Sequence, residues 1–258
     1  MSRLSLESKR KLQRIAADAW PAKEIEQYGG WQLRANHGIT SRANSVFPEN
    51  PPPTEVEKAI DYAISFYKRR KITPQFQLTN FTQPPNLDEA LKARGFTILM
   101  PTQVEIAAVD DLLQHQIDIP VLTSNHVTNR WIKRYQEMLD LSNYYVKIRR
   151  KIMERISQPK LLVEISYDGK IVSLALGVVH KEWVGLFSVT TDPEYRRLGC
   201  ATAASCAIAK WAKELGVEHA YLQVESDNTP ALDLYRKLGF GKYFDYWYRT
   251  LEVETPRA

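Results

Sequence analysis

The second half of the chain alternates between two spacings of hydrophobic residues, and each change of spacing marks a predicted element. Three apolar stretches have the length and residue types of β-strands: residues 160–168, 171–180 and 183–191. Residues 201–215 repeat apolar side chains at helical spacing, and Gly216 ends that helix. A strand, a short helix with Thr229 as its N-cap, and an aromatic strand follow: residues 220–224, 229–239 and 243–251. This order predicts an α/β fold with a central mixed sheet flanked by helices.

The first half of the chain shows a related but less regular pattern. The spacing predicts a helix over about the first 20 residues, and GWQLRANHGITSRANSVFP predicts a hairpin that turns at His37-Gly38. Thr54 and Glu57 have the spacing of a capping box for a helix that runs to Arg70. Two strands, one helix and a mostly helical connection complete the prediction: residues 75–79, 103–109, 87–94 and 127–156.

Composition narrows the class of protein. The 258 residues are 44% hydrophobic, which is enough to form an ordinary globular core. Cys200 and Cys206 are the only cysteines, and they have no CxxC spacing and no paired histidine, so we expect neither a disulfide framework nor a metal site. No apolar run reaches about 18 residues, and the first 20 residues lack the apolar core of a secretory signal. We therefore expect a cytoplasmic protein with no membrane partner.

The net charge of +5 is modest and is concentrated in two basic clusters, at residues 68–71 and 147–151. Both clusters end or lie on helical patterns, where cations near a helix C-terminus are favourable. No helix-turn-helix, zinc-finger or RNA-binding signature accompanies them, so we expect no nucleic-acid partner. A small anionic ligand is equally compatible with this charge.

The stretch DPEYRRLGCATAA, from Asp192 to Ala204, lies where a predicted strand ends and a helix begins. The first turn of a helix has backbone N–H groups without intrahelical partners, and with the helix dipole these groups form an anion site. Gly199 leaves room for a phosphate to approach the backbone, and Arg196 and Arg197 add guanidinium donors. Taken alone, the pattern favours a plain left-handed turn that carries solvated arginines.

The wider context resembles the GNAT superfamily of acyl-CoA-dependent N-acyltransferases. The family signature (Q/R)-x-x-G-x-(G/A) reads here RRLGCA from Arg196, after a hydrophobic strand and Asp192-Pro193. Downstream, LQVESDNTPALDLYRKLGF is similar to the family's second motif: a strand, an Asn, a short helix with a Tyr, and Gly-Phe. The resemblance covers residues 123–258 and implies acetyl-CoA as cosubstrate, with no metal.

The resemblance also implies residue roles. Residues of the strand before the loop match the backbone that pairs with the pantetheine arm and polarises the thioester carbonyl: Val189, Thr190 and Thr191. The loop matches the pyrophosphate site: Arg196, Arg197, Leu198, Gly199, Cys200, Ala201 and Thr202. Asn228 matches a side chain that holds the cofactor arm, and Tyr235 matches the tyrosine that protonates the departing thiolate. Singly, each residue has an ordinary structural explanation: Val189 as core, Asn228 as a turn residue, Tyr235 as a helix-surface aromatic.

One position departs from the family pattern. Many relatives carry a general-base Glu in a Leu-Glu-Val setting, and this chain has Gln223 there, which cannot accept a proton. Glu225, Glu182 and Asp192 are alternative bases, and water suffices for an amine of low pKa, such as an α-amine near 8, unlike a lysine near ~10.4. A catalytically impaired acyl-CoA-binding or sensor protein is the alternative function.

The first half resembles a degenerate copy of the same unit. LDEALKARGFTILMPTQVEI aligns with LDLYRKLGFGKYFDYWYRTL at Gly-Phe, which places Leu91 opposite Tyr235. The proline-rich PENPPP stands opposite the phosphate loop, and prolines lack the N–H groups that a phosphate needs. We therefore divide the chain into a degenerate unit at residues 1–122 and a catalytic unit at 123–258. An unrelated α/β domain remains the alternative for the first half.

The resemblance therefore implies an N-acetyltransferase that uses acetyl-CoA and acts on a small-molecule or peptide amine by direct attack in a ternary complex. The hairpin residues Trp31, Arg34, Arg42 and Asn44 either shape the acceptor pocket or form a surface hairpin with paired charges. The acceptor and the oligomeric state are not readable from the sequence.

Overall fold

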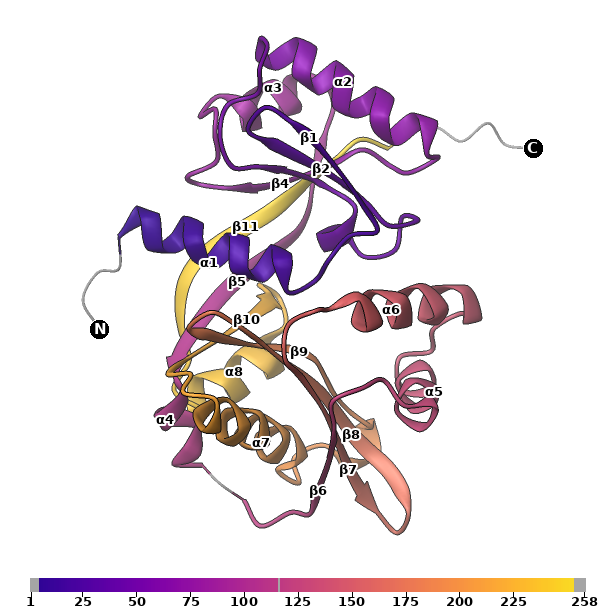
Figure 1. Cartoon of the computed structure of the whole chain (residues 1–258), viewed down its shortest axis with the longest axis vertical. Helices are drawn as coiled ribbons and strands as arrows, with labels where there is room; N and C mark the ends of the chain where they lie inside the picture. The colour runs from indigo at the N-terminus through magenta and orange to yellow at the C-terminus, as the bar shows by residue number, and fades with distance from the viewer. Residues whose placement is uncertain (1–4, 116, 253–258) are drawn as a thin grey trace. The chain divides into compact units, whose positions relative to one another are not determined.

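The computed structural model of the chain describes residues 5–115 and 117–252 (Figure 1). These residues form two compact units. Unit 1 comprises the described parts of Met1–Gln13, Trp20–Thr102 and Phe244–Ala258, and unit 2 comprises Arg14–Ala19 and Gln103–Tyr243. Three elements contribute residues to both units: helix α1 (Leu6–Asp18) and strands β5 (Thr97–Ala108) and β11 (Gly241–Thr250).

Unit 1 is a sheet with two helices. The sheet contains β1 (Glu24–Tyr28), β2 (Trp31–Ala35), β3 (Val46–Pro48), β4 (Gln75–Thr79) and part of β11, in the order β1-β2-β3-β4-β11. A 3-10 turn, η1, spans Ser41–Ala43. Helices α2 (Val56–Arg69) and α3 (Leu87–Ala93) contribute to one core with alternate residues of the strands, including Trp31, Leu33, Phe76 and Leu78. The opposite side chains of the same strands, such as Arg34 and Gln77, are also buried, and they are polar.

In unit 2 the strand order is β5-β10-β9-β8-β7-β6, and these strands belong to the same eleven-stranded sheet as those of unit 1. Apart from β5, the strands in this order are β6 (Val121–Ser124), β7 (Lys160–Tyr167), β8 (Lys170–His180), β9 (Trp183–Thr191) and β10 (His219–Glu225). Neighbouring strands from β6 to β9 are antiparallel, whereas β9 and β10 are parallel. The helices are α4 (Val109–Leu113), α5 (Asn129–Met138), α6 (Asn143–Arg155), α7 (Cys200–Glu214) and α8 (Thr229–Lys237), with the 3-10 turn η2 at Pro193–Tyr195. The predicted α/β class with a mixed sheet is confirmed.

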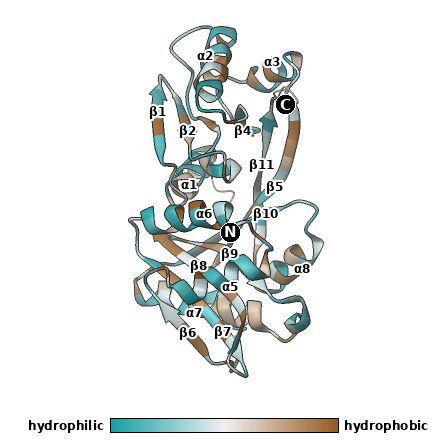
Figure 2. Ribbon diagram, turned by 90° about the vertical axis from the view of Figure 1, so that its right-hand side faces the viewer, coloured by the Kyte–Doolittle hydropathy of each residue, from teal (hydrophilic) through white to brown (hydrophobic). Residues whose placement is uncertain are grey.

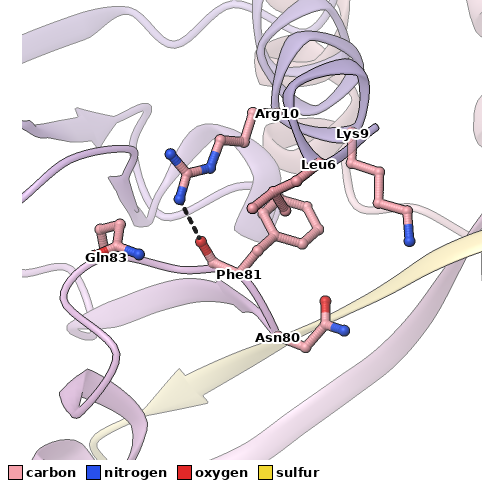
Figure 3. A pocket seen from close by; sticks show the side chains of 6 residues that line it. All are labelled: Leu6, Lys9, Arg10, Asn80, Phe81 and Gln83. Carbon is pink, nitrogen blue, oxygen red and sulfur yellow. Dashed lines mark hydrogen bonds between the residues drawn. The ribbon is translucent and has the colours of Figure 1, made fainter. Parts of the chain in front are cut away.

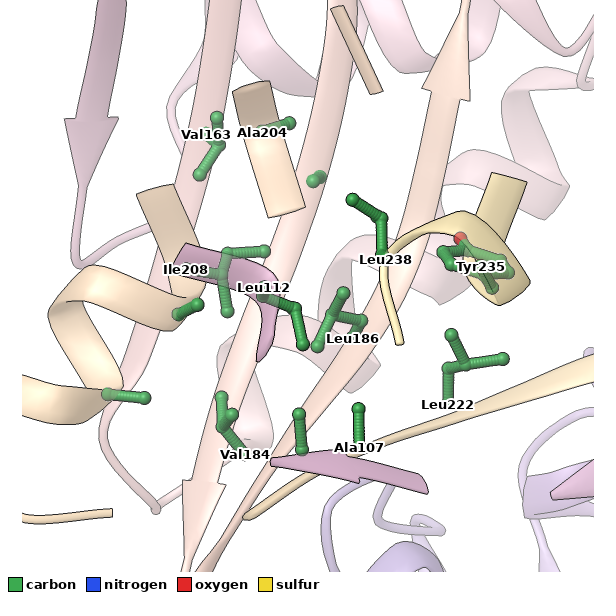
Figure 4. Packing of buried hydrophobic residues seen from close by; sticks show 14 of the residues in the cluster. Ala107, Leu112, Val163, Val184, Leu186, Ala204, Ile208, Leu222, Tyr235 and Leu238 are labelled. Carbon is green, nitrogen blue, oxygen red and sulfur yellow. The ribbon is translucent and has the colours of Figure 1, made fainter. Parts of the chain in front are cut away.

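Helix α7 lies close to the sheet because its inward residues are small. Ala204 and Ala209 are fully buried, and Ile208 packs so near to Gly177 of β8 that a Cβ there would lie 2.7 Å from Ile208 Cγ2. Figure 4 shows Ala204 and Ile208 in the same cluster as Val163, Val184 and Leu186 of the strands. By contrast, α5 is mainly hydrophilic along its length (Figure 2).

Two predicted helix starts are wrong in detail. Helix α2 begins at Val56 without a side-chain cap, because the hydroxyl of Thr54 instead lies 3.3 Å from that of Tyr28, and the carboxylate of Glu57 pairs with Arg94 at 3.0 Å. Helix α8 is capped by Asn228, one residue before the predicted Thr229. Elsewhere, the sequence prediction missed three elements: β1, α4 and β6. Among the described residues, no helix is both long enough and apolar enough to cross a membrane.

Candidate active site

The two parallel strands of unit 2 separate at their C-terminal ends. The β9–β10 ladder pairs Trp183 with His219 and ends at the pair Leu186–Leu222, although β9 continues to Thr191 and β10 to Glu225. Beyond that pair, β9 continues to pair only with β8 in the ladders described. The backbone of β9 therefore has an edge free of strand partners over its last residues, and this edge is available to an extended ligand.

A β-bulge lies at the start of this free edge. Leu176 of β8 pairs with Phe187, and Leu174 pairs with Thr190, so Ala175 faces two residues, Ser188 and Val189. Ser188 has a φ of 50°, a left-handed conformation that a non-glycine residue rarely adopts. Bulges and strained residues often occur next to active sites, where they redirect a backbone or side-chain group.

The predicted strand residues are held in different ways. Val189 packs against the apolar core of unit 2. The Ser173 hydroxyl donates to the Thr190 carbonyl at 3.0 Å and lies 2.9 Å from the Thr191 hydroxyl. These bonds fix β9 against β8 immediately before the phosphate loop. Sequence reasoning missed Ser188, whose buried hydroxyl has no partner among the described residues.

The predicted pyrophosphate loop has the geometry of an anion site. Gly199 is the N-cap of α7 and has a φ of 85°, and Arg197 also has a positive φ, of 67°. The N–H of Ala203 bonds the Gly199 carbonyl at 2.9 Å, so the N–H groups of Cys200, Ala201 and Thr202 precede that bond and point out of the helix end. Such a helix start attracts anions.

The charged side chains of this loop face solvent. Arg196, Arg197 and Leu198 are exposed, and the Nε of Arg196 donates a long hydrogen bond of 3.5 Å to the Thr191 carbonyl at the end of β9. Neither arginine forms an ion pair with a described residue. The arginines are therefore able to move toward a ligand without breaking an ion pair inside the fold.

Ile117, from the segment after α4, lies beside Gly199 of the predicted pyrophosphate loop. A Cβ added to Gly199 would lie 2.8 Å from Ile117 Cδ1, so the isoleucine methyl group already touches the glycine. The left-handed backbone at position 199 favours glycine, and the neighbouring isoleucine methyl group is the end of an exposed side chain that is able to move. Nothing in the spacing of the sequence identified Ile117 as a neighbour of this loop.

Asn228 has a structural role in addition to the one implied by the resemblance. Its Oδ1 accepts a hydrogen bond of 3.2 Å from the N–H of Ala231 and caps α8. The residue is exposed, so its amide nitrogen faces solvent and is accessible to a ligand.

Tyr235 is more deeply buried than a helix-surface aromatic would be. Its side chain belongs to the core of unit 2, packs edge-on against Phe240 with centroids 5.6 Å apart, and is 8% exposed (Figure 4). Burial raises the pKa of its hydroxyl well above 10, and the nearby carboxylate of Glu105 raises it further. The hydroxyl is therefore protonated at neutral pH and able to donate a proton.

Glu105 is a second residue that sequence reasoning missed. It lies on β5, is 6% exposed, and one of its carboxylate oxygens, Oε2, has no partner among the described residues. Burial raises its pKa, while Arg236 and Lys242 oppose that shift. The only sequence signal was an acidic residue within the apolar strand QVEIAAV.

The alternative bases differ in availability. Burial alone would raise the pKa of Asp192, but hydrogen bonds from Lys170, the Glu194 N–H and Arg134 together lower it, so this carboxylate is committed to ion pairs. Glu182 precedes Trp183, at the end of β9 remote from the bulge. Glu225 is exposed and ends β10, beside the point where the strands separate.

The cysteines are poor nucleophiles in this setting. Cys200 and Cys206 are free thiols and both are buried. Burial raises the pKa of both, to about 11 for Cys206, whose sulfur also lies 3.1 Å from the Leu112 carbonyl. Since the thiolate is the reactive form, neither is activated at neutral pH. Among the residues the structure describes, no group of His, Cys, Asp and Glu is arranged to hold a metal ion.

A separate pocket of about 350 Å³ lies in unit 1, lined by Leu6, Lys9, Arg10, Asn80, Phe81 and Gln83 (Figure 3). Arg10 donates a long hydrogen bond of 3.4 Å to the Phe81 carbonyl at its edge. The pocket contains none of the predicted site residues.

Comparison with known proteins identifies the family. The profile described as "Probable histone acetyltransferase Rv0428c C-terminal" matches residues 8–249. The N-acetyltransferase YobR of Bacillus subtilis is 28% identical over 243 residues, which cover 93% of this chain and 97% of that protein. The probable histone acetyltransferase Rv0428c of Mycobacterium tuberculosis is 25% identical over 238 residues, or 90% of this chain and 70% of that protein.

Solved structures share the fold. A GCN5-related N-acetyltransferase from Kribbella flavida superposes with a TM-score of 0.68 at 17% identity, over 96% of this chain and 95% of that one. A tandem GNAT protein from the clavulanic acid biosynthesis pathway gives a TM-score of 0.59 at 13% identity, over 78% and 69%. Since the family profile spans most of its length, the chain belongs to the family of the C-terminal part of Rv0428c and is a GNAT acetyltransferase.

Proposed function

We propose that this protein transfers an acetyl group from acetyl-CoA to a primary amine by direct attack within a ternary complex. One observation carries the proposal: strands β9 and β10 separate beyond Leu186 and Leu222, next to a helix that begins at the left-handed Gly199. The first feature provides an unpaired backbone edge for an extended arm, and the second provides an anion site for a pyrophosphate.

The residues present fit acetyl-CoA. The backbone of Val189–Thr191 would pair with the pantetheine arm, the loop of residues 196–202 would hold the pyrophosphate, and Asn228 would contact the arm through its amide nitrogen. The left-handed Gly199 at the start of α7 supports this fit, and the exposed side chain of Ile117 beside it would have to move to admit a pyrophosphate. Acetyl-CoA supplies the acetyl group as an activated thioester.

The chain's own groups would supply the rest of the chemistry. Backbone donors at the β9 bulge would face the developing negative charge on the carbonyl oxygen. Tyr235 would donate the proton that the CoA sulfur needs as it leaves, and its raised pKa keeps the hydroxyl in the protonated form at neutral pH. Gln223 stands where relatives have a base, so the attacking amine would lose its proton to water or to Glu225, the accessible carboxylate at the end of β10.

We propose an acceptor amine of low pKa, such as an α-amine. Gln223 supports this choice, because an amine with a pKa near ~8 is partly neutral at physiological pH without a strong base. The name of one relative refers to acetylation of an alanine in a ribosomal protein, and this supports the choice. This relative, the [ribosomal protein bS18]-alanine N-acetyltransferase of Escherichia coli, is 29% identical over 79 residues, which cover 31% of this chain and 53% of that protein.

The two halves of the chain have different roles in this proposal, and both lie in a reducing compartment. We assign residues 1–122 to a degenerate GNAT-like unit and 123–258 to the catalytic unit, so one acetyl-CoA should bind per chain. The two free cysteines fit a reducing compartment, and we place the protein in the cytoplasm.

The test is thiol release from acetyl-CoA with a panel of amino acids, peptides, polyamines and lysine derivatives, combined with titration calorimetry of acetyl-CoA. We expect one site per chain and turnover with at least one α-amine. Tight acetyl-CoA binding with no turnover on any amine would favour the sensor function. Two equivalent acetyl-CoA sites would contradict the degenerate first unit.

A further inference from the structure

Arg34 of β2 is a buried cation whose bonding is incomplete. Its side chain is 2% exposed. Nε donates to the Ser45 carbonyl at 3.3 Å, and one terminal nitrogen donates to the Ser45 hydroxyl at 3.0 Å and to Gln77 Oε1 at 2.7 Å. The other terminal nitrogen is buried and has no hydrogen-bond partner among the described residues. Two N–H donors of a charged group are therefore unused.

Within residues 5–115 and 117–252, no carboxylate forms a hydrogen bond with this guanidinium. All of its acceptors are neutral, and the Phe47 ring lies 4.8 Å from its central carbon. Glu49 acts on it only through longer-range electrostatics, and burial is the main influence on its pKa, which is lowered. Because arginine stays protonated in proteins, its charge is present without a bonded counter-ion, and such burial is costly.

The same unit shows how a buried arginine is normally accommodated. Arg249 of β11 is 6% exposed, and its guanidinium forms two hydrogen bonds to the carboxylate of Asp88, at 2.8 and 3.0 Å. Its third bond goes to the Phe96 carbonyl at 3.2 Å. Among the described residues, Arg249 therefore has a carboxylate partner, whereas Arg34 has only neutral hydrogen-bond partners.

Neutral polar groups that are able to donate hydrogen bonds lie near Arg34, and the charges of Glu49 and Arg42 act on this cluster through longer-range electrostatics. Tyr248 of β11 is the cross-strand neighbour of Gln77. Tyr246, two residues earlier in β11, lies on the same face. Both tyrosines are buried, and burial raises the pKa of each, so both hydroxyls are protonated at neutral pH. The Tyr67 hydroxyl donates to the Arg34 carbonyl at 3.0 Å and fixes the strand at this point.

We propose that this polar face of unit 1 binds a carboxylate, held by the unused terminal nitrogen of Arg34 and the hydroxyl of Tyr248. A carboxylate matches the site because its oxygens accept hydrogen bonds and carry the charge that the guanidinium lacks. A water molecule would satisfy the donors but would leave the charge uncompensated. The ligand is either the acceptor, as in an amino acid, or an amine-free carboxylate effector, and the chemistry of recognition is the same.

The test is thermal unfolding of the full chain without acetyl-CoA, so that its outcome is independent of the proposed transferase reaction. Sodium acetate, sodium propionate and glycine are titrated against sodium chloride at matched ionic strength. Saturation near 100 times Kd should raise Tm by roughly 5 °C. Arg34→Met, which removes the charge but keeps an unbranched side chain, should abolish that rise. Arg94→Gln, which removes a surface arginine paired with Asp61 and Glu57, should keep it.

A second measurement needs only the wild-type protein. The guanidinium Nε–H resonance of a buried arginine is observable by ¹H–¹⁵N NMR, and that of Arg34 should shift on addition of acetate and not of chloride. Glycine that raises Tm and is also acetylated, with a higher KM in Arg34→Met, would identify an acceptor. A response confined to acetate and propionate would identify an effector. Equal Tm in carboxylate and chloride, with no movement of the Arg34 resonance, would overturn the proposal.

Discussion

Tyr235→Phe tests whether the Tyr235 hydroxyl acts as the general acid, apart from any role of the side chain in packing. The substitution keeps the ring that packs edge-on against Phe240 and removes only the oxygen. In the described part of the chain that hydroxyl forms no hydrogen bond, so its loss should change the free energy of unfolding by no more than about 0.5 kcal/mol.

The expected catalytic effect is much larger. General acid catalysis contributes typically ~10²–10⁴-fold, and a thiol with a pKa near ~8.5 is already a fair leaving group, so the lower end applies. A loss of about 10²-fold in kcat corresponds to about 2.7 kcal/mol of transition-state stabilisation. The Kd for acetyl-CoA should stay nearly constant, because the lost interaction forms only as the sulfur departs.

The assay is single-turnover acetyl transfer with the best acceptor, and the matched control is Tyr135→Phe. Tyr135 is also buried in unit 2, where its ring stacks on Trp131 at 5.1 Å, and it has no proposed role in transfer. Because the Tyr235 pKa is raised, kcat should show no fall attributable to this tyrosine up to about pH 9. A Tyr235→Phe enzyme as fast as wild type, or a Tyr135→Phe enzyme equally slow, would refute the assignment.

Three other predictions concern the loop at Gly199, the two cysteines and the Asp88–Arg249 ion pair. Gly199→Glu should weaken acetyl-CoA binding at least 100-fold by calorimetry, whereas Gly216→Glu, at the far end of α7 with a similar φ of 76° and open space around it, should bind normally. Replacement of both Cys200 and Cys206 by Ala should preserve kcat per folded molecule, and a trapped acetyl-cysteine would contradict direct transfer. Asp88→Asn should destabilise the protein by about 2 kcal/mol in urea, less than for a fully buried pair because 38% of the Asp88 side chain is exposed. Hydrogen bonding to Arg249 lowers the folded-state pKa of Asp88, so this stability should be present above about pH 4, lost as pH falls below it, and absent from the variant at every pH.

Local spacing predicted strands β7 to β10 and helices α7 and α8 of unit 2, because their apolar residues pack on one core, whereas the short elements α4 and β6 were missed. The helix starts were harder to predict, since a cap depends on which polar group is nearest in space. Thr54 had the right spacing to cap α2, yet its hydroxyl lies next to that of Tyr28, 26 residues away along the chain. Asn228 and Thr229 are both good caps, and the prediction of Thr229 was wrong because the side chain of Asn228 accepts the hydrogen bond from the Ala231 N–H.

The candidate site was predictable only where its residues are contiguous. The loop around Gly199 follows one strand and begins one helix, so motif and geometry coincide. Ile117 and Glu105 come from parts of the chain more than 70 residues before the strand end and the loop of the site. Asp192 forms ion pairs with Arg134 and Lys170, so it is not available as a general base. These contacts join separate elements, and the sequence did not predict them.

The paths of strands β5 and β11 limit which parts of the gene can be lost without unfolding the protein. Each strand has residues in both compact units, so no single cut in the chain yields one complete unit and leaves the other intact. A gene that lost its first 122 codons would also lose Ala107, Val109 and Leu112, which belong to the core around α7. One recombination event therefore cannot discard the first unit, whether or not that unit has any catalytic use. Selection for a folded transferase is enough to preserve both units together.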